Sequence, residues 1–309
     1  MRTENFDLSG DGRVRLRAFL HAPSEEMPTW RTRPAVVVCP GGGYNMLSDR
    51  EAEPVAFNFL ALGYHAFVLR YSIGDHAAWP NPVADLSRAV TLIREHSEEW
   101  NLMPDRIAVC GFSAGGHLAA CLGTLWNHPE ISGYCLINGD NRPNALILGY
   151  PCILYDPEWY PEIYQKLTGN RRDEEMSKIL SCEKNVGDHT PPVFIFHTYS
   201  DNCVPVEHSM AFANAMITAD RPVELHIFQN GIHGISLGTE VTSSGHKSMV
   251  NADASAWFPM AAAWLRDLFE LKDSSITTSA VFGSPAGRAH LHTTPLDWSA
   301  ALSEGEDKQ

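Results

Sequence analysis

The stretch RIAVCGFSAGGHLA, residues 106–119, contains the pattern that decides the fold. Residues 106–111 have the apolar run of a buried strand, and the residues from 113 onward have the pattern of a helix. Between them, Gly111, Ser113 and Gly115 form a G-x-S-x-G pattern. The pattern alone is weak because it recurs by chance. A strand before it and a helix after it are the context that a nucleophile elbow requires.

The glycines of this pattern have a geometric purpose. A chain that turns sharply at Ser113 would bring bulky neighbours two positions away into collision, so Gly111 and Gly115 give room. The hydroxyl would then stand at the carboxyl end of the sheet, beside a helix N-terminus that favours negative charge. The alternative is a glycine-rich helix start that is capped by a serine. We predict that Ser113 is a nucleophile.

Strands and helices alternate along the chain. Six segments are predicted strands: 35–39, 65–71, 106–111, 145–150, 193–199 and 223–228. Four segments have helical patterns: 83–97, 113–126, 206–219 and 253–271, where Pro259 must kink the last helix or mark its start. Most of the strands are apolar throughout, as in a parallel sheet that is covered on both faces. The order predicts a doubly wound α/β domain.

We expect this domain to span residues 1–272. Residues 151–190 break the alternation and are predicted to form a small cap insertion of short helices. Residues 273–309 are rich in Ser, Thr, Gly and charge. They form a C-terminal extension, for which disorder and docking on this or another subunit are the two alternatives.

The composition excludes several classes of partner. The net charge of −14 argues against nucleic acid and against an anionic membrane surface. The N-terminus is polar, without the core of a secretory signal, and no apolar run approaches the ~18 residues of a membrane span. The seven cysteines include no C-x-x-C pair, which is typical of reduced thiols. We therefore expect a cytoplasmic protein, and the sequence leaves its oligomeric state open.

A serine nucleophile needs a base, and the base needs an orienting carboxylate. Asp201 comes directly after one predicted strand, and His233 lies in the loop after the next. Because the carboxyl ends of parallel strands meet at one edge of a sheet, both should lie near Ser113. We expect Asp201 to accept the Nδ1 proton of His233, and Nε2 of His233 to take the proton of Ser113.

Other histidines are weaker candidates. His117 lies one turn into the helix after Ser113, where we expect it to pack, with a substrate contact as the alternative. His197 lies within a predicted strand and is expected to be a core histidine with satisfied hydrogen bonds. Metal-ligand spacings such as His-x-x-x-His are absent, so no metal and no cofactor is expected.

The glycines after the strand at 35–39 raise a separate question. The run CPGGGYN lacks the Lys-Ser/Thr of a Walker loop and the spacing of a dinucleotide fingerprint. A serine nucleophile needs two N–H donors for an oxyanion, of which Ala114 supplies one. Gly42 or Gly43 can supply the other, and a close-packed turn is the alternative. Tyr44, which follows, is a candidate for lining the acyl pocket.

With these residues in place, the chain resembles the α/β-hydrolases of the esterase/lipase group. Five pieces match in family order over residues 34–270: VVVCPGGGY, EPVAFNFLALGYHAFVLRYS, DRIAVCGFSAGGHLA, HTYSDNCVPV and FQNGIHG. The form CPGGGY, in place of the His-Gly-Gly-Gly of many relatives, resembles the carbohydrate acetylesterases, often described as acetyl-xylan-esterase-like. The resemblance implies an α/β-hydrolase fold of about eight strands. It also implies a serine esterase that removes short acyl groups, acetyl above all, from oligosaccharides without a cofactor.

Several other interpretations of the function remain open. The aromatic residues of the insertion, Trp159 and Tyr160 among them, would either face a sugar ring or anchor the insertion. Another carboxylesterase, an arylformamidase or a peptidase of the prolyl-oligopeptidase type would use the same three residues. Such peptidases usually carry a large N-terminal propeller. A ligand-binding homologue without turnover would typically lack one of the three residues.

Overall fold

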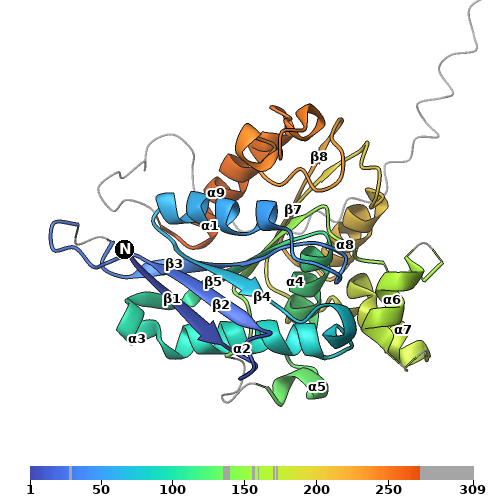
Figure 1. The fold of residues 1–309 in the computed structure, drawn as a ribbon, viewed down its shortest axis with the longest axis horizontal. Helices are drawn as coiled ribbons and strands as arrows, with labels where there is room; N and C mark the ends of the chain where they lie inside the picture. Colours follow the sequence, from blue (N-terminus) through green and yellow to red (C-terminus); the bar gives the residue numbers. More distant parts are fainter. Residues whose placement is uncertain are drawn as a thin grey trace, which may run out of the picture. The chain divides into compact units, whose positions relative to one another are not determined.

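The structure is a computed structural model that describes residues 1–27, 30–134, 140–154, 157–158, 160–169, 171 and 173–271. Its centre is an eight-stranded sheet in the order β1-β2-β4-β3-β5-β6-β7-β8 (Figure 1). The strands are β1 (Arg2–Asp7), β2 (Arg15–Leu20), β3 (Arg33–Cys39), β4 (His65–Arg70), β5 (Leu102–Phe112), β6 (Ala145–Gly149), β7 (Val193–Thr198) and β8 (Val223–Phe228). The first two strands run antiparallel to their neighbours, and β3 to β8 are parallel.

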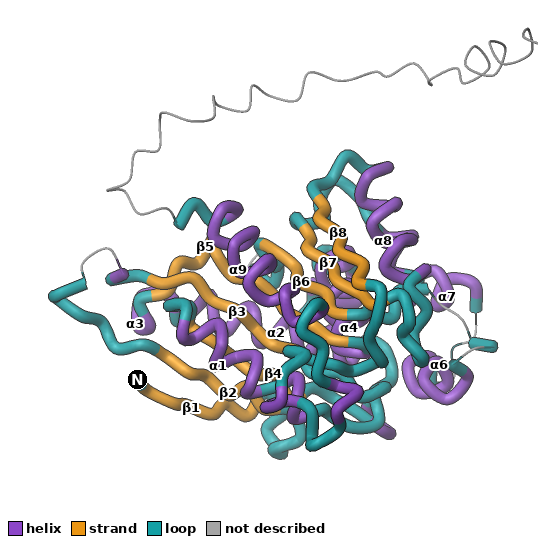
Figure 2. The backbone as a smooth tube through the Cα atoms, turned by 90° about the horizontal axis from the view of Figure 1, so that it is seen from above, coloured by secondary structure: helices purple, strands orange, loops and turns teal. Residues whose placement is uncertain are grey.

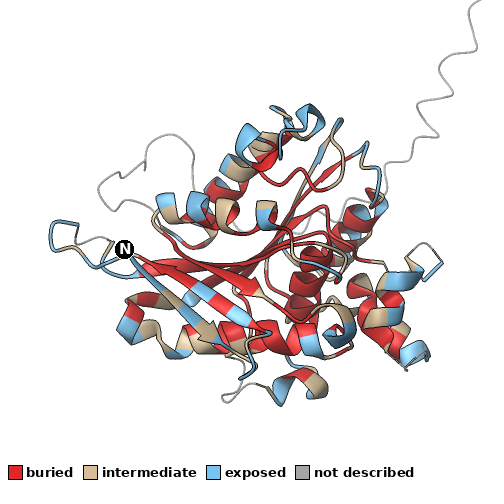
Figure 3. Ribbon diagram, viewed as in Figure 1, coloured by how far each residue is buried: buried red, intermediate tan, exposed pale blue. Residues whose placement is uncertain are grey.

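Apolar side chains cover both faces of the central strands, which explains their unbroken apolar runs. Along β3, Val37 belongs to the apolar core on one face, and Val36 and Val38 belong to the core on the other. Successive side chains of a strand point to opposite faces, so both sets must be apolar when helices cover both faces. Figure 3 shows these strands as buried along most of their length.

Helices form a layer on each face of the sheet (Figures 1 and 2). Residues of α1 (Glu53–Ala61) and α9 (Trp257–Leu268) pack into one core. Residues of α2 (Asn81–Glu95), α4 (Ala114–Leu125) and α8 (Glu207–Thr218) pack into the other. The shorter helices are α3 (Ser97–Trp100), α5 (Pro129–Ser132), α6 (Pro161–Thr168) and α7 (Glu174–Leu180). The 3-10 helices are η2 (Asp49–Glu51), η3 (Gly74–His76), η4 (Cys182–Asn185), η5 (Glu240–Thr242), η6 (Lys247–Met249) and η7 (Ala254–Ala256).

The predicted doubly wound architecture is confirmed, and all six predicted strands are present within a few residues. The sequence did not predict β1, β2 or α1. The first strand is mostly exposed, so its side chains are not the apolar run that identifies a buried strand. Pro259 lies in the first turn of α9, where its missing N–H leaves no hydrogen bond unmade, and the helix therefore begins at Trp257.

The segment 151–190 carries α6, α7 and η4. Figures 1 and 2 show α6 and α7 side by side, beyond one end of α4 and near α8. Asp173 caps α7 by accepting the N–H of Met176 at 2.8 Å. The extension that we expected at 273–309 lies outside the described residues. Within the described part of the chain, no helix has the length and apolar content that crossing a bilayer requires.

Candidate active site

Ser113 stands between the end of β5 and the start of α4 with a φ of 52°. The left-handed backbone conformation is rare outside glycine and stores strain. Neighbouring backbone atoms leave no room for a side chain at the glycines around Ser113. A Cβ on Gly111 would lie 2.1 Å from the carbonyl oxygen of Gly115, and one on Gly115 would lie 2.1 Å from that of Cys39. These glycines are therefore required by close backbone approach, as the sequence suggested.

The structure brings Ser113, His233 and Asp201 together. His233 Nε2 lies 2.8 Å from Ser113 Oγ, and His233 Nδ1 lies 2.8 Å from Asp201 Oδ2. Asp201 follows β7, and His233 lies in the loop after β8, so both come from the carboxyl ends of adjacent parallel strands. Because Asp201 can only accept at Nδ1, Nε2 is left free to accept the serine proton.

The side chain of Asp201 is completely buried, and both of its oxygens accept hydrogen bonds. Its Oδ1 accepts the N–H groups of Cys203 at 2.8 Å and Val204 at 2.9 Å. Burial alone would raise the pKa of this carboxyl. The hydrogen bonds from His197, His233 and the Cys203 N–H, together with the charge of His233, lower the pKa below its usual value instead. Asp201 therefore stays ionised and can stabilise an imidazolium at His233.

His197 contacts Asp201, which the sequence did not predict. Its Nε2 lies 3.4 Å from Asp201 Oδ2 and 2.9 Å from the Val204 carbonyl oxygen. Two acceptors at Nε2 indicate that the proton is there, so Nδ1 accepts from the Ser209 hydroxyl at 2.7 Å. The expected satisfied core histidine is confirmed, and it also faces the carboxylate. A strand histidine four residues before an aspartate carries no signal of this contact in sequence.

The loop of His233 is held at its main chain and at its ring. The N–H of His233 donates to Asn202 Oδ1 at 3.0 Å. The ring of Tyr150 meets the imidazole edge-on, with centroids 5.0 Å apart. Gly234, at a φ of 76°, gives the turn that follows. The imidazole therefore has one orientation, toward Ser113.

The glycine loop after β3 presents two N–H groups that have no acceptor among the described residues. Gly42 and Gly43 have φ values of 129° and 61°, and no described residue accepts their N–H groups. The N–H of Gly41 is excluded because it donates to Glu51 Oε2 at 2.9 Å. Ala114 opens α4, so its N–H also lacks an intrahelical partner. These are the three donors that the sequence assigned to an oxyanion.

Glu51 supports this loop, and no motif in the sequence indicated this role. The side chain is 2% exposed, and its Oε1 accepts the hydroxyl of Tyr150 at 2.6 Å. That hydroxyl in turn accepts the N–H of Ser236 at 2.9 Å. Burial, followed by the charge of Glu51, raises the pKa of Tyr150, so the hydroxyl stays protonated as a donor. The buried carboxylate thus connects the glycine loop to the His233 loop.

Tyr44 and Tyr160, two predicted substrate contacts, line a small cavity of about 10 Å³ beside the elbow. Its walls are Tyr44, Ala114, His117, Cys152, Tyr160, Ile163, Tyr164 and Leu167. This volume holds about one water molecule. The hydroxyl of Tyr160 donates to the Cys203 carbonyl at 2.6 Å, which anchors the insertion to the loop of Asp201. Trp159, the third predicted contact, lies outside the described residues.

His117 of α4 is buried, as expected, and its Nε2 contacts the Leu180 carbonyl oxygen rather than Ser113 Oγ. Together with Cys121 and Cys182 it forms the group of described side chains whose donor atoms could hold a metal ion. The expectation of no metal rested on spacing along the chain, which does not report residues that only the fold brings together.

Comparison with known proteins shows the family of this chain. A family model described as BD-FAE matches residues 25–216, more than half of the chain. The chain belongs to the BD-FAE family. Acetylxylan esterase of Xylanibacter ruminicola is 32% identical over 240 residues, which cover 75% of this chain and 46% of that protein. Endo-1,4-beta-xylanase B of Butyrivibrio fibrisolvens is 37% identical over 222 residues, which cover 69% and 34%. This BD-FAE chain thus spans between a third and a half of the length of these two relatives.

Solved structures match this BD-FAE chain over most of both chains. The α/β-hydrolase MGS-M1 from a Medee basin deep-sea metagenome matches with a TM-score of 0.73 and 35% identity, over 87% of this chain and 98% of that one. An acetyl ester-xyloside bifunctional hydrolase from Caldicellulosiruptor lactoaceticus matches with a TM-score of 0.70 and 32% identity, over 85% and 91%. The chain is an α/β-hydrolase of the esterase group that is similar to acetylxylan esterases, as its resemblance implied.

Proposed function

We propose that this protein is a serine esterase that removes short acyl groups, acetyl above all, from oligosaccharides. One observation carries the proposal: Ser113 Oγ, the imidazole of His233 and the buried carboxylate of Asp201 form one chain of hydrogen bonds of 2.8 Å each. The names of the relatives support the class of reaction, since they include an acetylxylan esterase and an acetyl ester-xyloside hydrolase.

The first half of the reaction forms an acyl-enzyme. Ser113 Oγ attacks the ester carbonyl carbon while His233 Nε2 takes the hydroxyl proton, and Asp201 stabilises the imidazolium. The carbonyl oxygen becomes an oxyanion that the N–H groups of Ala114 and of Gly42 or Gly43 bind. The tetrahedral intermediate collapses, the bond to the sugar oxygen breaks, and His233 returns its proton to that oxygen.

The second half releases the acid. His233 takes a proton from a water molecule, whose oxygen attacks the acyl carbon. A second oxyanion forms in the same place, the bond to Ser113 Oγ breaks, and His233 reprotonates the serine. The products are the deacetylated oligosaccharide, with a free hydroxyl group, and acetic acid, and no cofactor takes part. Removing one oxyanion donor of this kind typically lowers kcat by about 10²–10³-fold.

The site favours a short acyl group. The cavity behind Ala114 has a volume of about 10 Å³. Chains longer than acetyl would need side chains such as Ile163 or Tyr44 to move. Tyr160 and Tyr164 of the insertion line the same cavity, and the hydroxyl of Tyr160 donates to the Cys203 carbonyl.

The test compares Ser113→Ala with the wild type on p-nitrophenyl acetate and on an acetylated xylo-oligosaccharide. We expect kcat to fall by roughly 10⁴-fold or more while the circular dichroism spectrum is unchanged. A fluorophosphonate should label the wild type and fail to label the variant. Full activity in Ser113→Ala would overturn the mechanism. A second test measures kcat/KM on a panel that adds longer p-nitrophenyl esters and N-formylkynurenine. A preference for this formamide would overturn the substrate assignment.

A further inference from the structure

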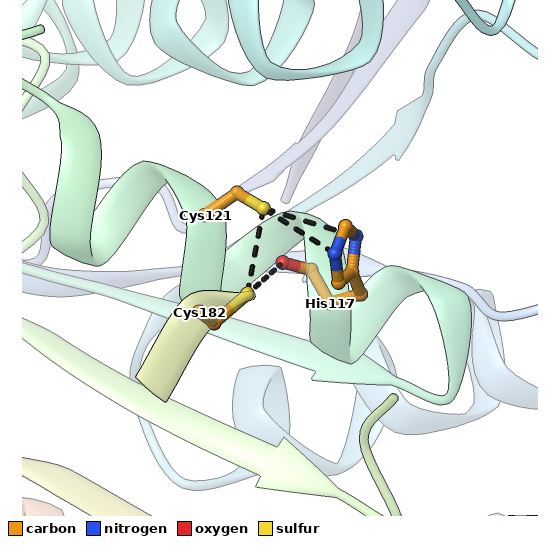
Figure 4. A group of neighbouring side chains, drawn as sticks. All are labelled: His117, Cys121 and Cys182. Carbon is orange, nitrogen blue, oxygen red and sulfur yellow. Dashed lines mark hydrogen bonds between the residues drawn. The ribbon is translucent and has the colours of Figure 1, made fainter. Parts of the chain in front are cut away.

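Two cysteine thiols and one histidine ring, which are potential metal ligands, meet in the core beside the nucleophile elbow (Figure 4). His117 and Cys121 stand one turn apart on α4, so they share one face of that helix. Cys182 reaches the same place from η4, at the end of the segment 151–190. All three are buried, and the esterase mechanism uses none of them.

Two of the three spacings between these atoms are those of ligands around one ion. Cys121 Sγ lies 3.5 Å from Cys182 Sγ and 3.6 Å from His117 Nε2. One donor atom from each residue lies within 4.8 Å of the other two. A tetrahedral zinc ion has Zn–S distances of about 2.3 Å and Zn–N distances of about 2.0–2.1 Å, which puts its ligand atoms roughly 3.5–3.8 Å apart. The two shortest separations therefore match without a rearrangement of the backbone.

We propose that His117, Cys121 and Cys182 bind one Zn²⁺-class cation in the core of this protein. Thiolate and imidazole are the ligands that zinc prefers. When the ion binds, the two thiols lose their protons and Nε2 of His117 exchanges its contact with the Leu180 carbonyl, 3.0 Å away, for the metal. Two thiolates then balance the charge of a divalent ion, so the core gains no net charge.

The surroundings of the cluster suit a cation in two ways. The hydroxyl of Tyr44 lies 2.9 Å from His117 Nδ1, and a bond at that nitrogen is what orients a ligating imidazole. Glu183, next to Cys182 in the chain, has a buried carboxylate oxygen without a hydrogen-bond partner in the described structure. A cation in the cluster would supply the positive charge that this oxygen lacks.

An ion at this place would connect two parts of the fold. The ion would join α4, which begins at the nucleophile elbow, to the segment that carries α6 and α7.

The experiment measures metal binding directly. The full chain, with any affinity tag removed and its thiols reduced, is stripped with a chelator and titrated with Co²⁺ and with Zn²⁺. A second sample is refolded from urea in the presence of each ion, because a buried site fills most readily while the chain folds. We expect one ion per chain, the visible bands of tetrahedral cobalt with a thiolate charge-transfer absorption, and a higher melting temperature with Zn²⁺.

Variants locate the ion. Cys121→Ser and Cys182→Ser should each lose the charge-transfer absorption and the shift in melting temperature. Cys203→Ser, which removes an exposed thiol elsewhere, should keep both. Stoichiometric binding that survives in the Cys121→Ser/Cys182→Ser double variant would overturn the proposal. So would a wild type that binds no ion in either preparation, and this outcome does not depend on whether any variant folds. Neither outcome bears on the esterase proposal, which is tested by Ser113→Ala.

Discussion

His197 Nε2 lies 3.4 Å from the same Asp201 oxygen that accepts the proton of His233 at 2.8 Å. One buried carboxylate oxygen therefore faces two imidazoles, of which only one faces Ser113. The Nε2 of this second imidazole faces two acceptors, Asp201 and the Val204 carbonyl, and its Nδ1 lies 2.7 Å from the Ser209 hydroxyl. Its hydrogen bond stabilises the ionised form of Asp201, and through it the imidazolium that forms at His233 during the reaction.

The first prediction follows from this contact. We expect His197→Phe to lower kcat by about tenfold with little change in KM, because a hydrogen bond to a charged group contributes roughly 1.5–3 kcal/mol and only part of it is expressed in the transition state. Steady-state hydrolysis of p-nitrophenyl acetate measures this. His226→Phe on the neighbouring strand is the control, since that ring contacts Glu224 instead. Equal kinetics for the two variants would show that His197 only packs.

The second prediction concerns the two glycines of the loop after β3. A Cβ on Gly42 would lie 2.2 Å from the Met46 carbonyl oxygen, whereas the nearest atom to one on Gly43 is Ile163 Cδ1 at 3.7 Å. We expect Gly42→Ala to lower kcat by about 10²-fold, the usual effect of a lost oxyanion donor. Gly43→Ala should cost about 1–2 kcal/mol of stability from its left-handed backbone, and less in kcat. The reverse order of kcat values would contradict this account of the loop.

The third prediction tests the support behind that loop. Glu51 uses both oxygens as acceptors, so Glu51→Gln must turn an amide NH₂ group toward one of two donors. We expect a loss of about 1–3 kcal/mol in the free energy of unfolding, and a lower kcat because the glycine loop shifts. Urea denaturation and steady-state kinetics measure the two effects. Glu53→Gln, two residues away at the half-buried start of α1, weakens only two ion pairs near the surface, with Arg17 and Arg70, and should cost less than about 1 kcal/mol. A loss there as large as that of Glu51→Gln would contradict the explanation.

The residues behind these predictions show what a single sequence can and cannot give. Ser113, Asp201 and His233 could be predicted because each follows a strand whose apolar run is visible, and parallel strands end at one edge. Glu51, Tyr150 and His197 could not, because their partners lie far away in the chain or on the next loop. A buried carboxylate in the run EAEPVA looks like any surface glutamate until its partners are seen. The contact between Cys182 and Cys121 could not be predicted for the same reason, since η4 reaches α4 only in the folded chain.

The fourth prediction concerns acyl length. Ile163 of α6 forms part of the wall of the cavity beside Ala114. We expect Ile163→Ala to raise kcat/KM for p-nitrophenyl butanoate relative to the acetate by roughly tenfold, since added methylenes in an apolar pocket contribute about 1–3 kcal/mol. Gln165→Ala, an exposed change on the same helix, should leave the ratio as it is. An unchanged ratio in Ile163→Ala would mean that the acyl group binds elsewhere.

The last prediction concerns acid stability. The pKa of Asp201 is lowered in the folded protein by hydrogen bonds from His197, His233 and the Cys203 N–H and by the charge of His233, which together outweigh burial. A carboxyl whose pKa is lower folded than unfolded contributes stability that is fully present above its unfolded pKa of about 3.9. This contribution is lost as the pH falls toward the folded pKa, because the unfolded chain binds the proton first.

We therefore expect Asp201→Asn to be less stable than the wild type at neutral pH, and the difference in urea midpoint between the two proteins to shrink as the pH falls from about 5 to about 2. Urea titrations of both proteins at several pH values measure the gap, and a gap that stays constant over this range would show that the ionised carboxylate does not stabilise the fold.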